Sequence, residues 1–183
     1  MNKKYFFTSD YHFMHNNVIR YDSRPFNDVH HMAETIINNH NSLVSNNDDF
    51  YFLGDFCFNR KYTEDYLSRL NGNKFFIKGN HDKSRDIAFY EKYGTYLGEQ
   101  CKINIDKYKQ DIVLNHFSMR VWDKHHHGSI HLYGHSHGSL EKYPNGKSMD
   151  VFIGNNDYYP YEISEILSIL NKRDIQKIDH HRR

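Results

Sequence analysis

Two features of the 183-residue sequence predict an α/β sandwich built as one domain. Short runs rich in aromatic and β-branched residues alternate with segments whose apolar residues recur every three or four positions, as is typical of α/β folds. No repeat, low-complexity linker or break in composition marks a boundary, and a chain of this length can enclose a core without disulfides. We therefore expect a single domain over residues 1–171, followed by a basic tail over 172–183 that frays.

The pattern places the expected elements in chain order. Residues 4–9 predict the first strand, 29–45 a helix and 50–53 the next strand. Thr63 is expected to cap a helix that ends at Leu70, just before Gly72. A strand follows at 74–78 and a weakly amphipathic helix at 86–93. Strands are then expected at 101–105, 111–115, 130–133 and 148–153, with 106–110 as a hairpin loop, and a final helix at 162–170.

The composition narrows the class of protein. There are 24 Lys and Arg against 23 Asp and Glu, so the net charge is +1, which does not favour the basic tail as a nucleic-acid binder. Aromatic residues at 16% argue against disorder. No apolar run could span a bilayer, no leader opens the chain, and two cysteines make no disulfide framework. We expect a cytoplasmic protein, and its 15 histidines require an explanation.

Polar residues that bind metals follow five of the predicted strands. Loops that leave the carboxyl ends of neighbouring strands converge on one crevice, so residues far apart in sequence can meet there. The first and last of these segments each hold two ligands one residue apart, which point the same way on an extended backbone. Glycines precede the ligands of three segments and allow close backbone approach. The candidate ligands are Asp10, His12, Asp55, Asn80, His116, His135 and His137.

The donor types limit the ion. Carboxylate, amide and imidazole groups suit Mn²⁺, Fe, Zn²⁺, Ni²⁺ or Co²⁺ better than Ca²⁺, and no cysteine cluster suggests a structural zinc or iron–sulfur site. Seven ligands are too many for one tetrahedral ion and suit two ions that share a carboxylate. Such a pair, about 3.5–4 Å apart, can position a hydroxide and clamp a phosphoryl oxygen.

In order and type, these segments resemble the motifs of the calcineurin-like metallophosphoesterase superfamily. The resemblance extends from Tyr5 to about Pro160, and the flanks at 8–13, 17–26 and 131–138 are similar to a small bacterial and bacteriophage subgroup. It implies a four-layer α/β/β/α fold with two mixed sheets and a dinuclear site at their edge.

The resemblance also implies a role for each residue. One ion would take Asp10, His12, Asp55 and His137, and the other would take Asp55, Asn80, His116 and His135, with Asp55 bridging. His81 matches the family's general acid. Asp82 matches the partner that would orient His81 or raise its pKa.

These expectations favour a metal-dependent phosphoesterase with two divalent ions, Mn²⁺ first among them. The segment at 54–60 lacks the Asp and Arg typical of the protein Ser/Thr phosphatase branch, so a protein substrate is disfavoured. We expect hydrolysis of small or nucleotide-like phosphodiesters such as cyclic nucleotides. A nuclease or nucleic-acid end-processing phosphatase with the same site is the alternative, and a metal-bound scaffold without catalysis is a third.

Other residues have two open interpretations. His15 is expected either to contact substrate or to hydrogen-bond behind the ligands. Arg24 is expected either to bind a substrate phosphate or to pin the loop before Pro25. The run at 125–127 is expected to be a loop in which one histidine could reach substrate, and Cys57 a packing residue rather than a nucleophile.

Overall fold

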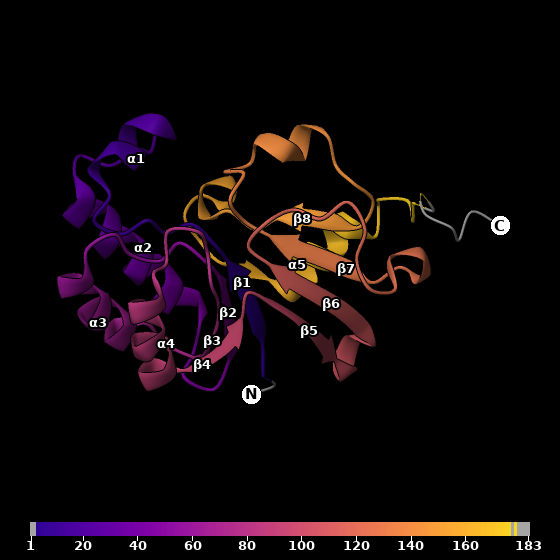
Figure 1. Ribbon diagram of the computed structural model, residues 1–183, viewed down its shortest axis with the longest axis horizontal. Coiled ribbons are helices and arrows are strands. Elements are labelled where there is room, and N and C mark those ends of the chain that lie inside the picture. The colour runs from indigo at the N-terminus through magenta and orange to yellow at the C-terminus, as the bar shows by residue number, and fades with distance from the viewer. Residues whose placement is uncertain (1–2, 177, 179–183) are drawn as a thin grey trace.

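Two mixed sheets organise the molecule in the computed structural model, which describes residues 3–176 and 178 (Figure 1). The first sheet has the order β4-β3-β2-β1-β9 and contains β1 (Tyr5–Thr8), β2 (Asp49–Leu53), β3 (Asn73–Ile77), β4 (Thr95–Gly98) and β9 (Tyr161–Glu162). The second runs β5 (Gln100–Ile105), β6 (Gln110–Asn115), β7 (Ile130–Tyr133) and β8 (Ser148–Asp150). Strands β1 to β4 are parallel, as are β6 to β8, while β9 and β5 are antiparallel to their neighbours. The predicted α/β class and the two mixed sheets are confirmed.

Helices α2 (Val29–Leu43), α3 (Arg60–Arg69) and α4 (Ile87–Tyr93) cover one face of the first sheet (Figure 1). Asp28 caps α2, because its carboxylate accepts the backbone N–H groups of His30 and His31, both at 2.8 Å. The short α1 (Asn16–Tyr21) follows the loop after β1, and α5 (Ile163–Leu170) packs against β1, β8 and β9.

Strand β2, at the centre of the first sheet, is buried on both faces, as parallel strands usually are. Alternate residues of β2 divide between two cores: Phe50 and Phe52 pack beneath the helices, while Tyr51 and Leu53 face the second sheet. The buried face of α5 joins the core between the sheets. These two cores fix the relative position of the sheets, and hence of the loops at their ends.

The outer face of the second sheet differs from the implied four-layer arrangement. The segment 117–129 covers this outer face and carries a 3₁₀ turn (His125–His127). Trp122 of that segment packs on the ring of His131, with ring centroids 5.3 Å apart. Among the described residues, the helices α2 to α4 thus form a layer on the first sheet without an equivalent layer on this face of the second.

Several predicted boundaries need correction. Helix α3 begins three residues before Thr63, at Arg60, because Asn59 caps it by accepting the N–H of Lys61. The strand expected at 148–153 ends at Asp150, and a 3₁₀ turn occupies Ile153–Asn156. Helix α1 and strands β4 and β9 were not predicted.

The start of the tail is tied to the domain. Arg173 donates to the backbone oxygen of Ser148 and pairs with Glu141 at 2.7 Å, so the first residues of the expected tail contact the domain, while residues 177 and 179–183 lie outside the described residues. Within the described part of the chain, no helix combines the length and apolar character needed to cross a membrane.

Candidate metal centre

The carboxyl ends of five strands bring the predicted ligands together. Asp10 and His12 follow β1, Asp55 follows β2 and Asn80 follows β3. His116 follows β6, and the pair at 135 and 137 follows β7. An isolated bridge between Ser9 and Phe152 joins the ends of the two sheets. The predicted convergence on one crevice is therefore present.

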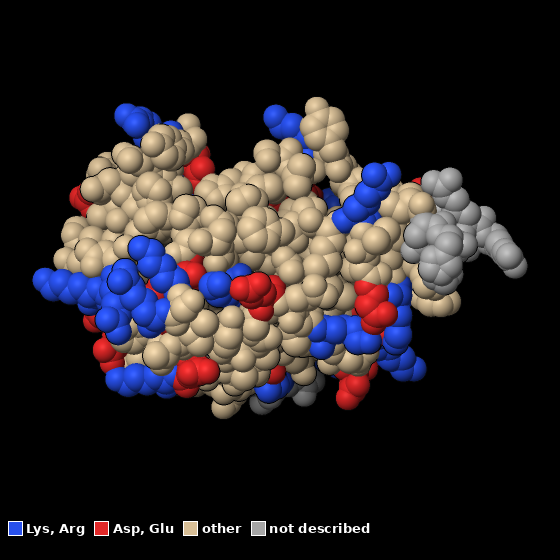
Figure 2. All heavy atoms as spheres, viewed as in Figure 1, with Lys and Arg blue, Asp and Glu red and all other residues tan. Residues whose placement is uncertain are grey.

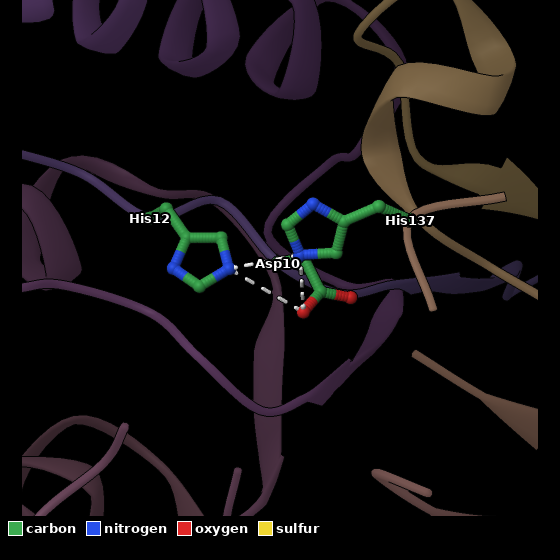
Figure 3. A group of neighbouring side chains, drawn as sticks. All are labelled: Asp10, His12 and His137. Atoms are coloured by element: carbon green, nitrogen blue, oxygen red, sulfur yellow. Dashed lines mark hydrogen bonds and ion pairs between the residues drawn. The ribbon is translucent and has the colours of Figure 1, made fainter. Parts of the chain in front are cut away.

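One group of ligand atoms surrounds the carboxylate of Asp10. Its Oδ1 lies 3.6 Å from Nε2 of His12 and 3.5 Å from Nε2 of His137, and the two Nε2 atoms are 3.1 Å apart. Figure 3 shows both imidazole rings turned toward this carboxylate. Two imidazole nitrogens and a carboxylate oxygen that point at one small volume form a group that could hold a divalent transition metal.

A second group gathers around Asn80. Its Oδ1 lies 2.9 Å from Nε2 of His116 and 2.9 Å from Nδ1 of His135. Nε2 of His116 is also 3.4 Å from Oδ2 of Asp55. The amide oxygen thus shares its neighbourhood with two imidazoles and a carboxylate.

Asp55 lies between the two groups. Its Oδ2 is 3.7 Å from Nε2 of His12 in the first group and 3.4 Å from Nε2 of His116 in the second. Its Oδ1 instead accepts the backbone N–H of His81 at 2.8 Å. The same carboxylate oxygen can therefore serve two ions, which is the bridging position that the resemblance implied for Asp55.

Two observations indicate that these residues fit a pair of metal ions: an unpartnered ligand atom and the orientation of two imidazole rings. Oδ1 of Asp10, which faces Nε2 of His12 and of His137, is buried and has no hydrogen-bond partner among the described residues. The rings of His116 and His137 are oriented through their Nδ1 atoms, which donate to the backbone oxygen of Leu53 at 2.7 Å and to Asp22 at 2.9 Å. Their Nε2 atoms are thereby left free to bind a cation.

Carboxylates and imidazoles lie close together at the site and shift one another's pKa. Burial alone would raise the pKa of Asp10, but the neighbouring imidazoles of His12 and His137 hold it well below its usual range. Burial alone would lower the pKa of His116 and His137, yet the neighbouring carboxylates raise both to about 9. Without a cation, protons on these rings balance the carboxylates, so metal binding must release them.

Five of the seven ligands adopt left-handed backbone conformations. Asp10, His12, Asp55, His135 and His137 have φ of 58°, 51°, 63°, 65° and 45°. The expectation of an extended backbone at the paired ligands is therefore wrong. Positive φ costs a non-glycine residue about 1 kcal/mol or more, and such strain concentrates where geometry serves function.

Two glycines allow the ligands to approach the backbone. A Cβ at Gly79 would lie 2.2 Å from Oδ1 of Asp55, and one at Gly134 would lie 2.5 Å from Oδ2 of Asp10. Any side chain at these positions would displace a ligand, which agrees with the close approach predicted for them.

His81 lies at the mouth of the site, but Asp82 does not orient it. The ring of His81 is exposed and its centroid is 5.6 Å from that of His12. The carboxylate of Asp82 points into the protein, where it accepts the N–H groups of Asp55 at 2.8 Å, Phe56 at 3.0 Å and Gly79 at 2.8 Å, and the hydroxyl of Tyr90 at 2.7 Å. The expected partnership is wrong, because adjacent side chains diverge here. Asp82 instead fixes the loop that carries Asp55.

The two tentative substrate residues differ in accessibility. His15 lines a cavity of about 280 Å³ together with Tyr21, His81 and several ligands. Arg24 has a fully buried side chain that donates to the backbone oxygens of Asp10 at 3.1 Å and Tyr11 at 2.9 Å. The geometry therefore favours the structural interpretation of Arg24.

Two carboxylates that hold the site were missed from the sequence. Asp22 binds both Arg24 and His137. Asp150 accepts the hydroxyl of Ser136 at 2.5 Å and the N–H of Gly138 at 2.8 Å, so it pins the turn between the last two ligands. The one signal for Asp150 in the sequence was its position within a predicted strand.

The remaining candidates lie away from the ligands. His125 packs on Trp122 with ring centroids 4.2 Å apart, and His127 lines a separate, shallow cavity beside the β5–β6 loop. Burial raises the pKa of the Cys57 thiol to about 11, which makes it a poor nucleophile. His180 and His181 of the tail lie outside the described residues.

Two known proteins similar to this chain carry no named activity. No family model matches the sequence. The chain is 34% identical over 178 residues to an uncharacterized protein of Methanocaldococcus jannaschii, MJ1445, and the alignment covers 93% of each chain. The crystal structure of a protein of unknown function from Aquifex aeolicus, AQ665, superposes with a TM-score of 0.73 at 22% identity, covering 92% of this chain and 100% of that one. The second comparison supports the fold alone.

Proposed function

The chain belongs to the family of the Methanocaldococcus jannaschii protein MJ1445, and we propose that it is a metal-dependent phosphodiesterase with a dinuclear centre. We also propose that its two mixed sheets are a version of the metallo-dependent phosphatase fold. One observation carries the proposal: Oδ2 of Asp55 lies within 3.7 Å of two separate imidazole groups, between two sets of convergent ligands.

The distances between their atoms divide the candidate ligands into two sets. Asp10, His12 and His137 would hold one ion, and Asn80, His116 and His135 the other, with Asp55 shared. Two divalent transition-metal ions, when bound, would supply Lewis-acid stabilisation of the phosphoryl oxygens and a nucleophile at neutral pH. Mn²⁺ is the first candidate, and Fe, Zn²⁺, Ni²⁺ and Co²⁺ share the required coordination chemistry.

His81 is the group best placed to give a proton to the leaving oxygen. It lines the same cavity as the ligands, and its backbone N–H binds Asp55 at 2.8 Å, so its loop is fixed relative to the centre. A positioned histidine that protonates the leaving group contributes about 10²- to 10⁴-fold to a rate. Catalysis would thus combine charge neutralisation at the ligands with proton donation from the cavity wall.

The test is turnover of bis-p-nitrophenyl phosphate against p-nitrophenyl phosphate, with Mn²⁺, Ni²⁺, Mg²⁺, Zn²⁺ or chelator, alongside the metal content of the protein. We expect two ions per chain and metal-dependent cleavage of the diester. His116→Ala should lose both an ion and the activity. His30→Ala is the matched control, because His30 is exposed on α2 and belongs neither to the ligand groups nor to the lining of their cavity.

Two results would contradict the proposal. A preference for the monoester would show that the centre serves a phosphatase rather than a diesterase. Absence of turnover in a protein that holds two ions would favour a non-catalytic scaffold.

A further inference from the structure

A second cavity adjoins His81. It has a volume of about 170 Å³ and shares that histidine with the 280 Å³ cavity of the metal ligands. Its lining residues are Cys57, Phe58, Arg60, His81, Lys83, Arg85 and Asp86. Because the proposed proton donor belongs to both cavities, a substrate held at the metal centre can extend into the second one.

The second cavity carries unbalanced positive charge. Three cations line it against the single carboxylate of Asp86, which accepts the backbone N–H of Lys83 at 2.8 Å. Within the described chain, Arg60, Lys83 and Arg85 form no ion pair. Figure 2 shows Lys and Arg side chains gathered over this α3–α4 side of the molecule.

Neighbouring cations on the same helices behave differently. Arg69 of α3 pairs with Glu34, and Lys92 of α4 pairs with Glu64. Glu34 and Glu64 thus pair with cations outside the cavity, and Asp86 is the one carboxylate among the residues that line it. Two arginines and a lysine that line one hollow are the side-chain types that bind a phosphate group, and the guanidinium of Arg60 also lies over the ring of Phe89, 5.1 Å from its centroid.

The two sides of His81 differ in character. Toward the metal ligands, the cavity is walled by Val18 and by Tyr21, which is 66% exposed. On the other side, the exposed ring of Phe58 contacts His81 with centroids 4.8 Å apart and leads to the cations. The cations among the lining residues of the two cavities thus lie on the Phe58 side of His81.

We propose that the second cavity binds an additional phosphate on the leaving group, so that the substrate is a phosphodiester carrying a second phosphate. The inference rests on the proposed function, because His81 marks the leaving-group side only if it protonates the leaving oxygen. The chemistry is shared by short nucleic-acid strands and by small nucleotides with two phosphates.

The reaction is a balanced hydrolysis. Water forms a new P–O bond, and the P–O bond to the leaving group breaks with its electron pair on the leaving oxygen. That oxygen takes a proton from His81, while the proton lost by water passes to solvent, from which His81 regains its own. The products are a phosphomonoester and an alcohol that bears the second phosphate.

The experiment compares kcat/KM for thymidine dinucleotides without a terminal phosphate, with a 5′-phosphate and with a 3′-phosphate. We expect one phosphorylated dinucleotide to be favoured about tenfold, mainly through KM, since a charged hydrogen bond has about that value. Arg60→Gln/Arg85→Gln should bring the ratio close to one. Lys61→Gln/Lys107→Gln, which removes the same charge from exposed positions outside the cavity, should preserve it. Equal rates in the wild type, or equal ratios in both double variants, would overturn the proposal.

A ten-residue thymidine strand separates the two sources of the second phosphate. A further gain over the phosphorylated dinucleotide, with a steep dependence on salt, indicates a nucleic-acid strand. Equal kcat/KM for both indicates a small substrate. Either outcome supports the additional phosphate.

A binding measurement separates failure of this inference from failure of the proposed function. Thymidine 3′,5′-bisphosphate contains two phosphates and no diester, and its binding to the chelated protein is measured by calorimetry. We expect at least fivefold weaker binding in Arg60→Gln/Arg85→Gln than in the lysine control. Such a difference without any turnover would overturn the phosphodiesterase and keep the anion site, whereas turnover without it would overturn the anion site alone.

Discussion

The carboxylate of Asp22 lies with both oxygens 2.9 Å from Nδ1 of His137, a residue 115 positions later in the chain. On its other side, Asp22 binds the guanidinium of Arg24 at 2.8 Å, and Arg24 binds the backbone oxygen of Asp10 at 3.1 Å. One chain of contacts thus orients the imidazole and the carboxylate that face each other at the candidate centre.

Asp22→Asn should weaken metal binding at the Asp10 group. The amide keeps the shape of the side chain but loses the charge that fixes the imidazole, and such changes behind a ligand cost about 10- to 100-fold in affinity. Titration with Mn²⁺ in a competing chelator measures the effect, with Asp65→Asn, an exposed residue of α3, as the control. Unchanged affinity would show that Asp22 does not support the site.

The sequence predicted the candidate ligands that the structure brings together, but not the residues that support them. Ligands such as Asp55 and His116 are recognisable because their chemistry and their positions after strands are both visible in one dimension. The contacts of Asp82 are not, because its partners are mostly backbone N–H groups whose positions depend on the folded loop. Asp22 was missed for a related reason, since no spacing links it to His137.

The backbone conformation of the candidate ligands could not be predicted from the sequence either. Left-handed φ at Asp10 and His12 could not be predicted, because side-chain type favours it only weakly outside glycine. The edge strand β9 was also missed, since two residues carry too little pattern to recognise. The core strands were predicted because strands buried on both faces carry continuous aromatic runs, and such runs are visible in the sequence.

Tyr90→Phe should destabilise the loop that carries Asp55. The substitution removes the 2.7 Å hydrogen bond to the buried carboxylate of Asp82, which we expect to lower the free energy of unfolding by about 1.5 kcal/mol. Asp82→Asn should cost more, about 2 to 3 kcal/mol, because its amide N–H₂ would face backbone donors. Urea denaturation measures both, and Tyr143→Phe, at a residue 79% exposed, should leave stability unchanged. A neutral Tyr90→Phe would contradict this role.

Acid should destabilise the metal-free protein partly through His40. Its Nδ1 lies 3.4 Å from the hydroxyl of Tyr11 and its Nε2 lies 3.0 Å from the backbone oxygen of Asn71, so the ring is neutral and donates through Nε2. Burial lowers the pKa of His40 to about 4, below the 6.5 of the unfolded chain. Its stabilising contribution is therefore complete above pH 6.5 and is lost as the pH falls toward 4.

Denaturation at pH 7.5 and pH 5 measures this effect. Between these values, the free energy of unfolding of His40→Gln should fall by about 2 kcal/mol less than that of the wild type. His30→Gln, an exposed residue of the same helix, should follow the wild type. Parallel losses in all three proteins would exclude His40 as the titrating group.

Asp55→Asn and His81→Ala should separate metal binding from proton donation. Asp55 lies within reach of both ligand groups, so loss of its charge should lower the occupancy of both ions. The ring of His81 belongs to neither group, so His81→Ala should keep two ions and lower turnover, most strongly for diesters with poor leaving groups. Metal analysis and a series of aryl phosphodiesters measure the two effects. If His81→Ala lost both ions, or slowed good and poor leaving groups equally, His81 would not be the proton donor.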